Sequence, residues 1–168
     1  MMQTRVAVAR WIAFSVLLLL SVTLQTMVFP RISAVPNPMV SVVAAVSLAM
    51  FSGVWGGMAA GAVSGMLCDA LLPHIEAYYT LTTMAAGALT GFLCGKIMQR
   101  NFWSALLLCT ASVCVIEMFY VLFFHVATGR APWSAMGFVG VPEILASIVC
   151  IPVIYPAFRG VAKIFAGD

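Results

Sequence analysis

Long apolar runs, broken at prolines, charges and glycines, divide this chain into six segments. The runs cover approximately residues 11–29, 39–51, 54–72, 78–97, 102–126 and 139–165. Most approach the roughly 20 residues that an α-helix needs to cross a bilayer. The second run is short, and only Ser52 and Gly53 separate it from the third, so these two runs are predicted to form a tight helical hairpin. The pattern predicts an all-α integral membrane protein with six transmembrane helices in a single membrane domain over residues 1–168.

Composition supports this class and excludes several others. The chain is 64% hydrophobic and 8% charged, with a mean hydropathy of +1.11, whereas a soluble domain carries about 25% charged residues. No basic run with interleaved aromatic residues favours nucleic-acid binding. The cysteines lie in apolar segments without a C-x-x-C pair, so they are predicted to be small packing residues, with a disulfide framework or a metal site as the alternative. They are Cys68, Cys94, Cys109, Cys114 and Cys150.

The positions of the basic residues predict the orientation. With six spans and a cytoplasmic N-terminus, most cations lie in the cytoplasm, as the positive-inside rule requires. These are Arg5, Arg10, Lys96, Arg100, Arg159 and Lys163, and only Arg31 and Arg130 are outside. Joining the second and third runs into one span would move four of those cations outside. We therefore expect both termini in the cytoplasm and an uncleaved first helix, because its apolar run is long for a signal peptide.

Glycine recurs at helical spacing in two of the predicted spans. The first ladder is Gly53, Gly57, Gly61 and Gly65, and its next step of four is Asp69; the second ladder is Gly87, Gly91 and Gly95. In a soluble helix each glycine would cost about 1 kcal/mol relative to alanine. In a membrane this spacing makes a smooth groove that lets a neighbouring backbone approach closely. The ladders are therefore predicted to form a helix-packing groove.

The predicted topology gathers the internal acidic residues in the outer half of the membrane domain. Asp69, Glu117 and Glu143 lie within or beside spans, and Arg130 follows the fifth span. The favoured interpretation is structural: these residues are buried polar groups that bind one another, backbone groups or a partner chain. An ion or proton path is one alternative. A metal or hydrolytic site with His74, His125 and the acids is another, although no metal-binding or catalytic motif is present.

Small and polar residues also share helix faces. In the fourth span, one face carries Thr80, Thr83, Gly87, Thr90 and Gly91. Such faces either meet inside the protein or leave one face open for the helix of a partner, and the sequence leaves both possibilities open. We expect no catalysis, no cofactor and no metal.

The order of these motifs resembles a known family. A first span ending in Leu24-Gln25 and Pro30 leads through Pro36-Asn37-Pro38 to a short second span. The glycine run ending in Asp69 follows, then Gly87-x3-Gly91, a mid-span Glu117, and Pro152-x3-Pro156 before Arg159. Over nearly the whole chain this resembles the bacterial rod shape-determining protein MreD family, and the glycine run ending in Asp69 is its most specific element.

The resemblance implies a function without catalysis. Members of this family are multi-pass proteins of the bacterial inner membrane that act as scaffolds of the cell-elongation machinery. The implied partners are MreC, the glycosyltransferase RodA and a class B penicillin-binding protein, with the actin-like MreB at the cytoplasmic face; self-association is possible. The six-helix outline also resembles the substrate-binding subunits of energy-coupling-factor vitamin transporters, which is the alternative function. A small ion-coupled transporter is a third interpretation, resting on Asp69 and Glu117.

Overall fold

A computed structural model describes residues 2–31, 37–71, 77–127 and 140–166, and most of these residues are helical. The helices are α1 (Met2–Thr23), α2 (Val40–Leu71), α3 (Tyr78–Lys96), α4 (Phe102–Ala127) and α6 (Val141–Ala166). A π-helical turn, Leu24–Val28, and a 3₁₀ turn, Phe29–Arg31, extend the end of α1.

Several helices have the length and composition of membrane spans. Within the described residues, four segments qualify: Val6–Arg31, Val40–Leu71, Phe102–Phe123 and Val141–Phe165. The chain is therefore a multi-pass helical membrane protein. α3 is not among the four, and the count of six spans and the orientation of the termini stay predictions.

α2 folds back on itself at Gly53. The backbone there has φ 77° and ψ −169°, a conformation that is costly for any residue with a Cβ. The thiol Sγ of Cys68 lies 3.3 Å from the hydroxyl Oγ of Ser41, although 27 residues separate them. In a straight helix the rise of 1.5 Å per residue would separate these positions by roughly 40 Å. Segment 40–71 therefore consists of two arms joined at Gly53, which is where the sequence predicted a hairpin.

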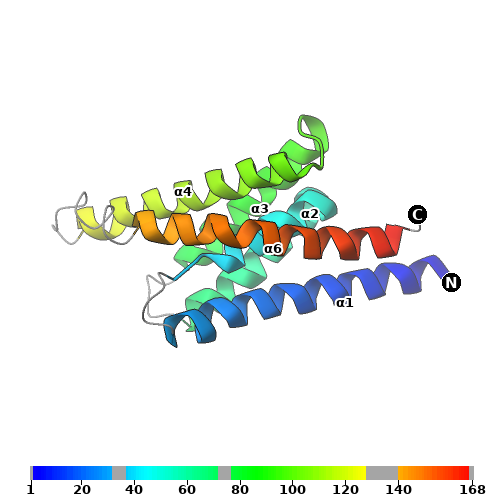
Figure 1. The fold of residues 1–168 in the computed structure, drawn as a ribbon, viewed down its shortest axis with the longest axis horizontal. Coiled ribbons are helices and arrows are strands. Elements are labelled where there is room, and N and C mark those ends of the chain that lie inside the picture. The colour runs from blue at the N-terminus through cyan, green and yellow to red at the C-terminus, as the bar shows by residue number, and fades with distance from the viewer. Residues whose placement is uncertain (1, 32–36, 72–76, 128–139, 167–168) are drawn as a thin grey trace.

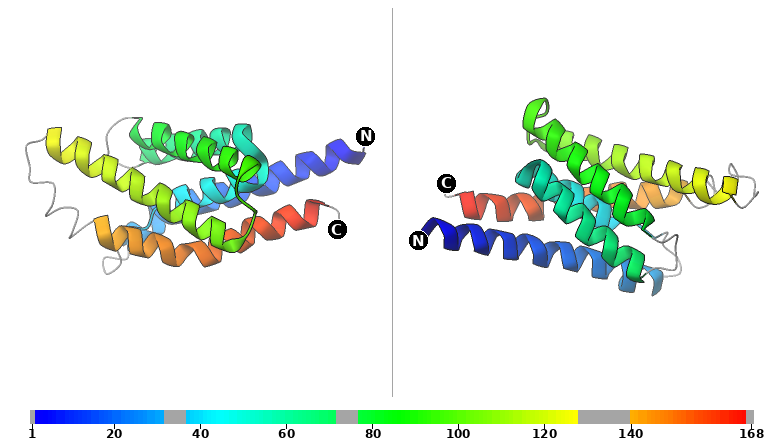
Figure 2. Two further views of the ribbon diagram at one scale, coloured as in Figure 1. Left: turned by 90° about the horizontal axis from the view of Figure 1, so that it is seen from above. Right: turned by 180° about the vertical axis from the view of Figure 1, so that it is seen from behind.

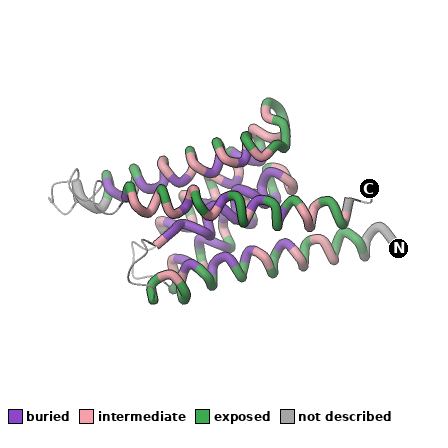
Figure 3. Tube along the Cα trace, viewed as in Figure 1, coloured by how far each residue is buried: buried purple, intermediate pink, exposed green. Residues whose placement is uncertain are grey.

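The first arm of α2 forms the centre of the molecule. Every residue from Val40 to Met50 is buried, and Figure 3 shows this buried stretch between α1 and α6, passing behind α6. α1 and α6 lie side by side, and the described ends of the chain lie at the same end of the molecule (Figure 1). The second arm of α2 runs alongside α3, as both views in Figure 2 show. The central arm can be apolar and small because neighbouring helices cover it on all sides.

The predicted bounds are close to the observed ones except at the first helix. α1 begins at Met2 rather than near Trp11. The prediction followed the uncharged apolar run, but Arg5 and Arg10 end only that run and do not stop a helix, because arginine is a good helix former. The prediction that the sixth span begins at residue 139 falls outside the described residues, and α6 begins at Val141.

Candidate functional site

The glycines of the α2 ladder lie against the backbone of α3. A Cβ added at Gly61 would overlap the carbonyl oxygen of Thr83, and one at Gly65 would overlap the Cα of Thr80. At Gly91, a Cβ would lie 2.5 Å from the carbonyl carbon of Gly53. These neighbours are main-chain atoms, which cannot move aside as a flexible side chain can. The ladder thus packs two helices of the same chain together.

Two ladder glycines have other positions. Gly53 is the hinge of α2, and a Cβ there would have no neighbour within 4 Å. Gly95 is exposed, and a Cβ there would likewise meet nothing within 4 Å. The prediction that Gly95 belongs to the packing groove was therefore wrong. The reason is that the second arm of α2 starts just after Gly53, so the close contact with α3 ends at Gly91.

Asp69, the carboxylate at the end of the ladder, caps the N-terminus of α3. Its Oδ1 accepts a hydrogen bond of 3.0 Å from the backbone N–H of Tyr79. Its Oδ2 accepts bonds of 2.9 Å and 2.6 Å from the backbone N–H and the hydroxyl of Thr80. The residue before α3 is Ala77, which provides no side-chain cap. A residue of the preceding helix therefore satisfies N–H groups that α3 itself leaves unpaired.

The buried start of α2 is capped from two other helices. Gln25, in the π-helical turn after α1, accepts a 2.7 Å bond at Oε1 from the Ser41 N–H. Ser147 of α6 accepts a 2.8 Å bond at Oγ from the Met39 N–H, and its own hydroxyl donates to the Glu143 carbonyl. These caps were not predicted from the sequence. The signal that could have indicated one of them is Gln25, a glutamine within an apolar run. A buried glutamine needs a hydrogen-bond partner in a dry environment.

Glu117 and Glu143 face each other across α4 and α6. Only 3% of Glu117 is exposed, and a side-chain hydrogen bond joins the two carboxyl groups. Tyr79, whose N–H binds Asp69, lies within electrostatic reach of both glutamates. The three described acids thus gather near the start of α3.

Several predicted residues lie outside the described part of the chain. They are His74 and Arg130, together with the side chain of His125, and the acidic residue Glu76 also lies outside the described part. The predicted pairing of Arg130 with the acids and the predicted alternative of a histidine-containing metal site therefore stay predictions. Among the described residues no group of three or more histidine, cysteine or acidic side chains could hold a metal ion. The five cysteines are free thiols.

An apolar groove of about 340 Å³ lies between α3 and α4. Small side chains line much of it, among them Ala85, Ala86, Ala111 and Ser112. Ala85 and Ala111 are exposed, so the groove opens on the outside of the helix bundle. In a membrane this face is available to lipid chains or to another helix.

Comparisons with protein-family models, curated proteins and solved structures found no match to this chain. What can be inferred about function therefore rests on the class of protein, a multi-pass helical membrane protein, and on the geometry described above.

Proposed function

We propose that this chain is a non-catalytic scaffold of the bacterial cell-elongation machinery in the inner membrane. The observation that carries the proposal is the use of the intramembrane polar groups: Asp69, Gln25 and Ser147 each bind the backbone at the start of a helix. Intramembrane polar residues that fix helices in place serve a rigid structural framework. The choice of the cell-elongation machinery rests on the order of sequence motifs, which resembles that of the MreD family.

The same geometry is less suited to ion transport. Both oxygens of Asp69 are engaged by α3, so moving an ion or proton through this group would break the cap. A transport path needs polar groups along a continuous route, and the described helices carry their acids near one end only.

The groove between α3 and α4 gives the scaffold a place for a partner helix. Residues such as Ala85 and Ala111 would let the backbone of another helix come close, as small residues do at membrane helix interfaces. The partner that we assign to the groove is the single transmembrane helix of MreC. RodA, a class B penicillin-binding protein and MreB would join the same assembly, as the family resemblance implies.

Depletion of the protein tests the cellular role. Rounded cells that regain rod shape when the gene is restored would support the scaffold. Normal shape together with a vitamin requirement would contradict it and favour the substrate-binding subunit of a vitamin transporter. Glu117→Gln adds a test of ion coupling, because an amide keeps hydrogen-bonding ability but cannot carry the proton. Retained rod shape with Glu117→Gln supports the scaffold, and its loss in a folded protein that still binds MreC favours ion coupling.

Filling the groove tests the proposed MreC contact. Ala85→Leu with Ala111→Leu should lower co-purification of MreC at matched protein levels, because leucine side chains hold a partner backbone apart. Ala157→Leu, at an exposed position on α6, is the matched control. Equal MreC recovery from both variants would show that the groove does not bind MreC.

A further inference from the structure

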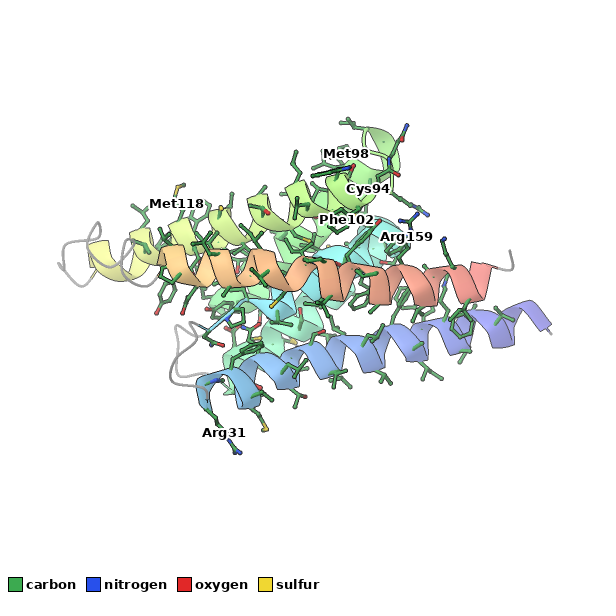
Figure 4. All side chains as sticks on the ribbon, viewed as in Figure 1. Arg31, Cys94, Met98, Phe102, Met118 and Arg159 are labelled. Atoms are coloured by element: carbon green, nitrogen blue, oxygen red, sulfur yellow. The ribbon has the colours of Figure 1, made fainter. Side chains whose placement is uncertain are left out.

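A second cavity lies at the end of the molecule that carries the chain termini. Its volume is about 270 Å³. It is lined by Arg10 and Phe14 of α1, Phe51 of α2, Arg100 between α3 and α4, and Arg159 and Lys163 of α6. Three segments that are far apart in sequence thus bring four cationic side chains to one hollow. Figure 4 shows Arg159 at this end and Arg31 at the opposite end of α1.

No described acid lines this cavity. Asp69, Glu117 and Glu143 gather near the start of α3, and Asp168 lies outside the described residues. The Nε atom of Arg10 is buried and has no hydrogen-bond partner within the described structure. Four like charges around one hollow repel one another, and a buried guanidinium nitrogen without a partner is costly. An anion in the cavity would relieve both effects.

Packing next to the cavity positions the backbone near two of the arginines. The Tyr155 hydroxyl donates a 3.2 Å hydrogen bond to the carbonyl oxygen of Arg100. Tyr155 lies one helical turn before Arg159, and its ring packs against Phe51 at 5.9 Å and Phe102 at 6.0 Å between ring centroids. This aromatic cluster therefore anchors the backbone of Arg100 and packs one helical turn from Arg159, at the same hollow.

The lining residues indicate the chemistry of the ligand. Guanidinium groups bind phosphate oxygens in a bidentate manner, and lysine adds a point charge. Phe14 and Phe51 provide an apolar wall, and on the same helix as Phe14 the apolar side chains of Trp11 and Ile12 are exposed. Basic pockets between transmembrane helices bind the headgroups of anionic lipids.

We propose that this cavity binds a phosphate group, supplied by the headgroup of an anionic phospholipid whose acyl chains lie along α1. A soluble phosphate compound has the same chemistry at the cavity but lacks the chains. The proposal is independent of the scaffold function, because it concerns the opposite end of the molecule from the acids and needs no partner protein.

Lipid binding by the purified full-length protein tests the proposal. Native mass spectrometry would measure the dissociation constants of phosphatidylglycerol and phosphatidylcholine. Removing one cation should weaken phosphatidylglycerol binding about fivefold, since each basic residue near an anionic surface contributes on the order of 1 kcal/mol. Arg100→Gln with Arg159→Gln should therefore weaken it roughly 25-fold. Phosphatidylcholine should bind weakly to every variant.

The control is Arg31→Gln, which removes an exposed cation at the far end of α1. A loss with Arg31→Gln equal to that with Arg159→Gln, or no loss with either, would overturn the proposal. If the double variant does not fold, Lys163→Gln alone should still show the fivefold loss. Glycerol 3-phosphate separates the two sources. If glycerol 3-phosphate displaces phosphatidylglycerol at concentrations near those of the lipid, the ligand is a soluble phosphate compound and the lipid assignment is contradicted. If it does not displace the lipid, the lipid assignment is supported.

Discussion

Gly57 of α2 and Gly87 of α3 face each other so closely that a Cβ on either would overlap the carbonyl oxygen of the other. The contact is reciprocal, so neither helix can gain a side chain here without moving the other. α2 and α3 form the most extensive helix pair in the described structure. The glycine pair is the centre of that contact, and the Asp69 cap closes it at the start of α3.

Replacing glycine by alanine should lower stability at a packed ladder position but not at the exposed Gly95. Gly61→Ala places a Cβ against the Thr83 carbonyl and should destabilise the protein by about 1–3 kcal/mol, as overpacking does. Gly95→Ala meets nothing within 4 Å and should be neutral or slightly stabilising. Thermal unfolding in detergent, read as folded protein by size exclusion, measures the difference. Equal unfolding midpoints would mean that the groove is not packed as described.

A disulfide between the two arms of α2 should form readily. Ser41→Cys, in a chain where the cysteines other than Cys68 are replaced by alanine, should crosslink to Cys68 under mild oxidation. The reason is that the Oγ and Sγ atoms lie 3.3 Å apart, which brings the Cβ atoms within reach of disulfide geometry. Mobility on a non-reducing gel, with and without reductant, reports the bond. Ser64→Cys with Cys68 intact gives a control within one arm, and crosslinking of the control alone would contradict the hairpin.

Substitutions that remove more of the hydrogen bonds at the α3 cap should cause larger losses of stability. Thr80→Val removes only the hydroxyl bond to Asp69 and should cost least. Asp69→Asn keeps one acceptor oxygen and should cost more. Asp69→Leu leaves the N–H groups of Tyr79 and Thr80 unpaired and should cost most, at about 1–3 kcal/mol for each buried group left without a partner. Folded yield at matched expression ranks the three variants, and any other order would argue against capping as the main role of Asp69.

The orientation predicted by the basic residues can be measured directly. A reporter fused after Lys163 should report cytoplasm, and one inserted at Glu76 should report periplasm. Both follow from six spans with a cytoplasmic N-terminus. A C-terminus outside the cell would contradict the six-span count.

The sequence predicted most helix bounds because strong local signals mark them. Prolines and charges separate the apolar runs, and α3 and α4 each end within one residue of the predicted position. The hairpin at Gly53 was also predicted, because a serine and a glycine alone separated two runs. The early start of α1 was missed because an arginine ends an apolar run without ending a helix.

The hydrogen-bond partners of the polar residues could not be predicted from the sequence. Asp69 and Thr80 lie on different helices, and Ala77 at the start of α3 gives no sign that a cap comes from elsewhere. Gln25 and Ser147 cap the same helix start from opposite ends of the chain. Such pairs depend on which helices become neighbours, and helical spacing within one segment carries no information about that.

The cap that Asp69 places on α3 has a consequence for how the chain enters the bilayer during synthesis. α3 carries four threonines and is not among the helices apolar enough to span a membrane by composition. Its first N–H groups gain their partner only when the preceding helix lies beside it. The second arm of α2 and α3 should therefore leave the insertion machinery together as a preassembled pair, with the glycine face already closed before either meets lipid.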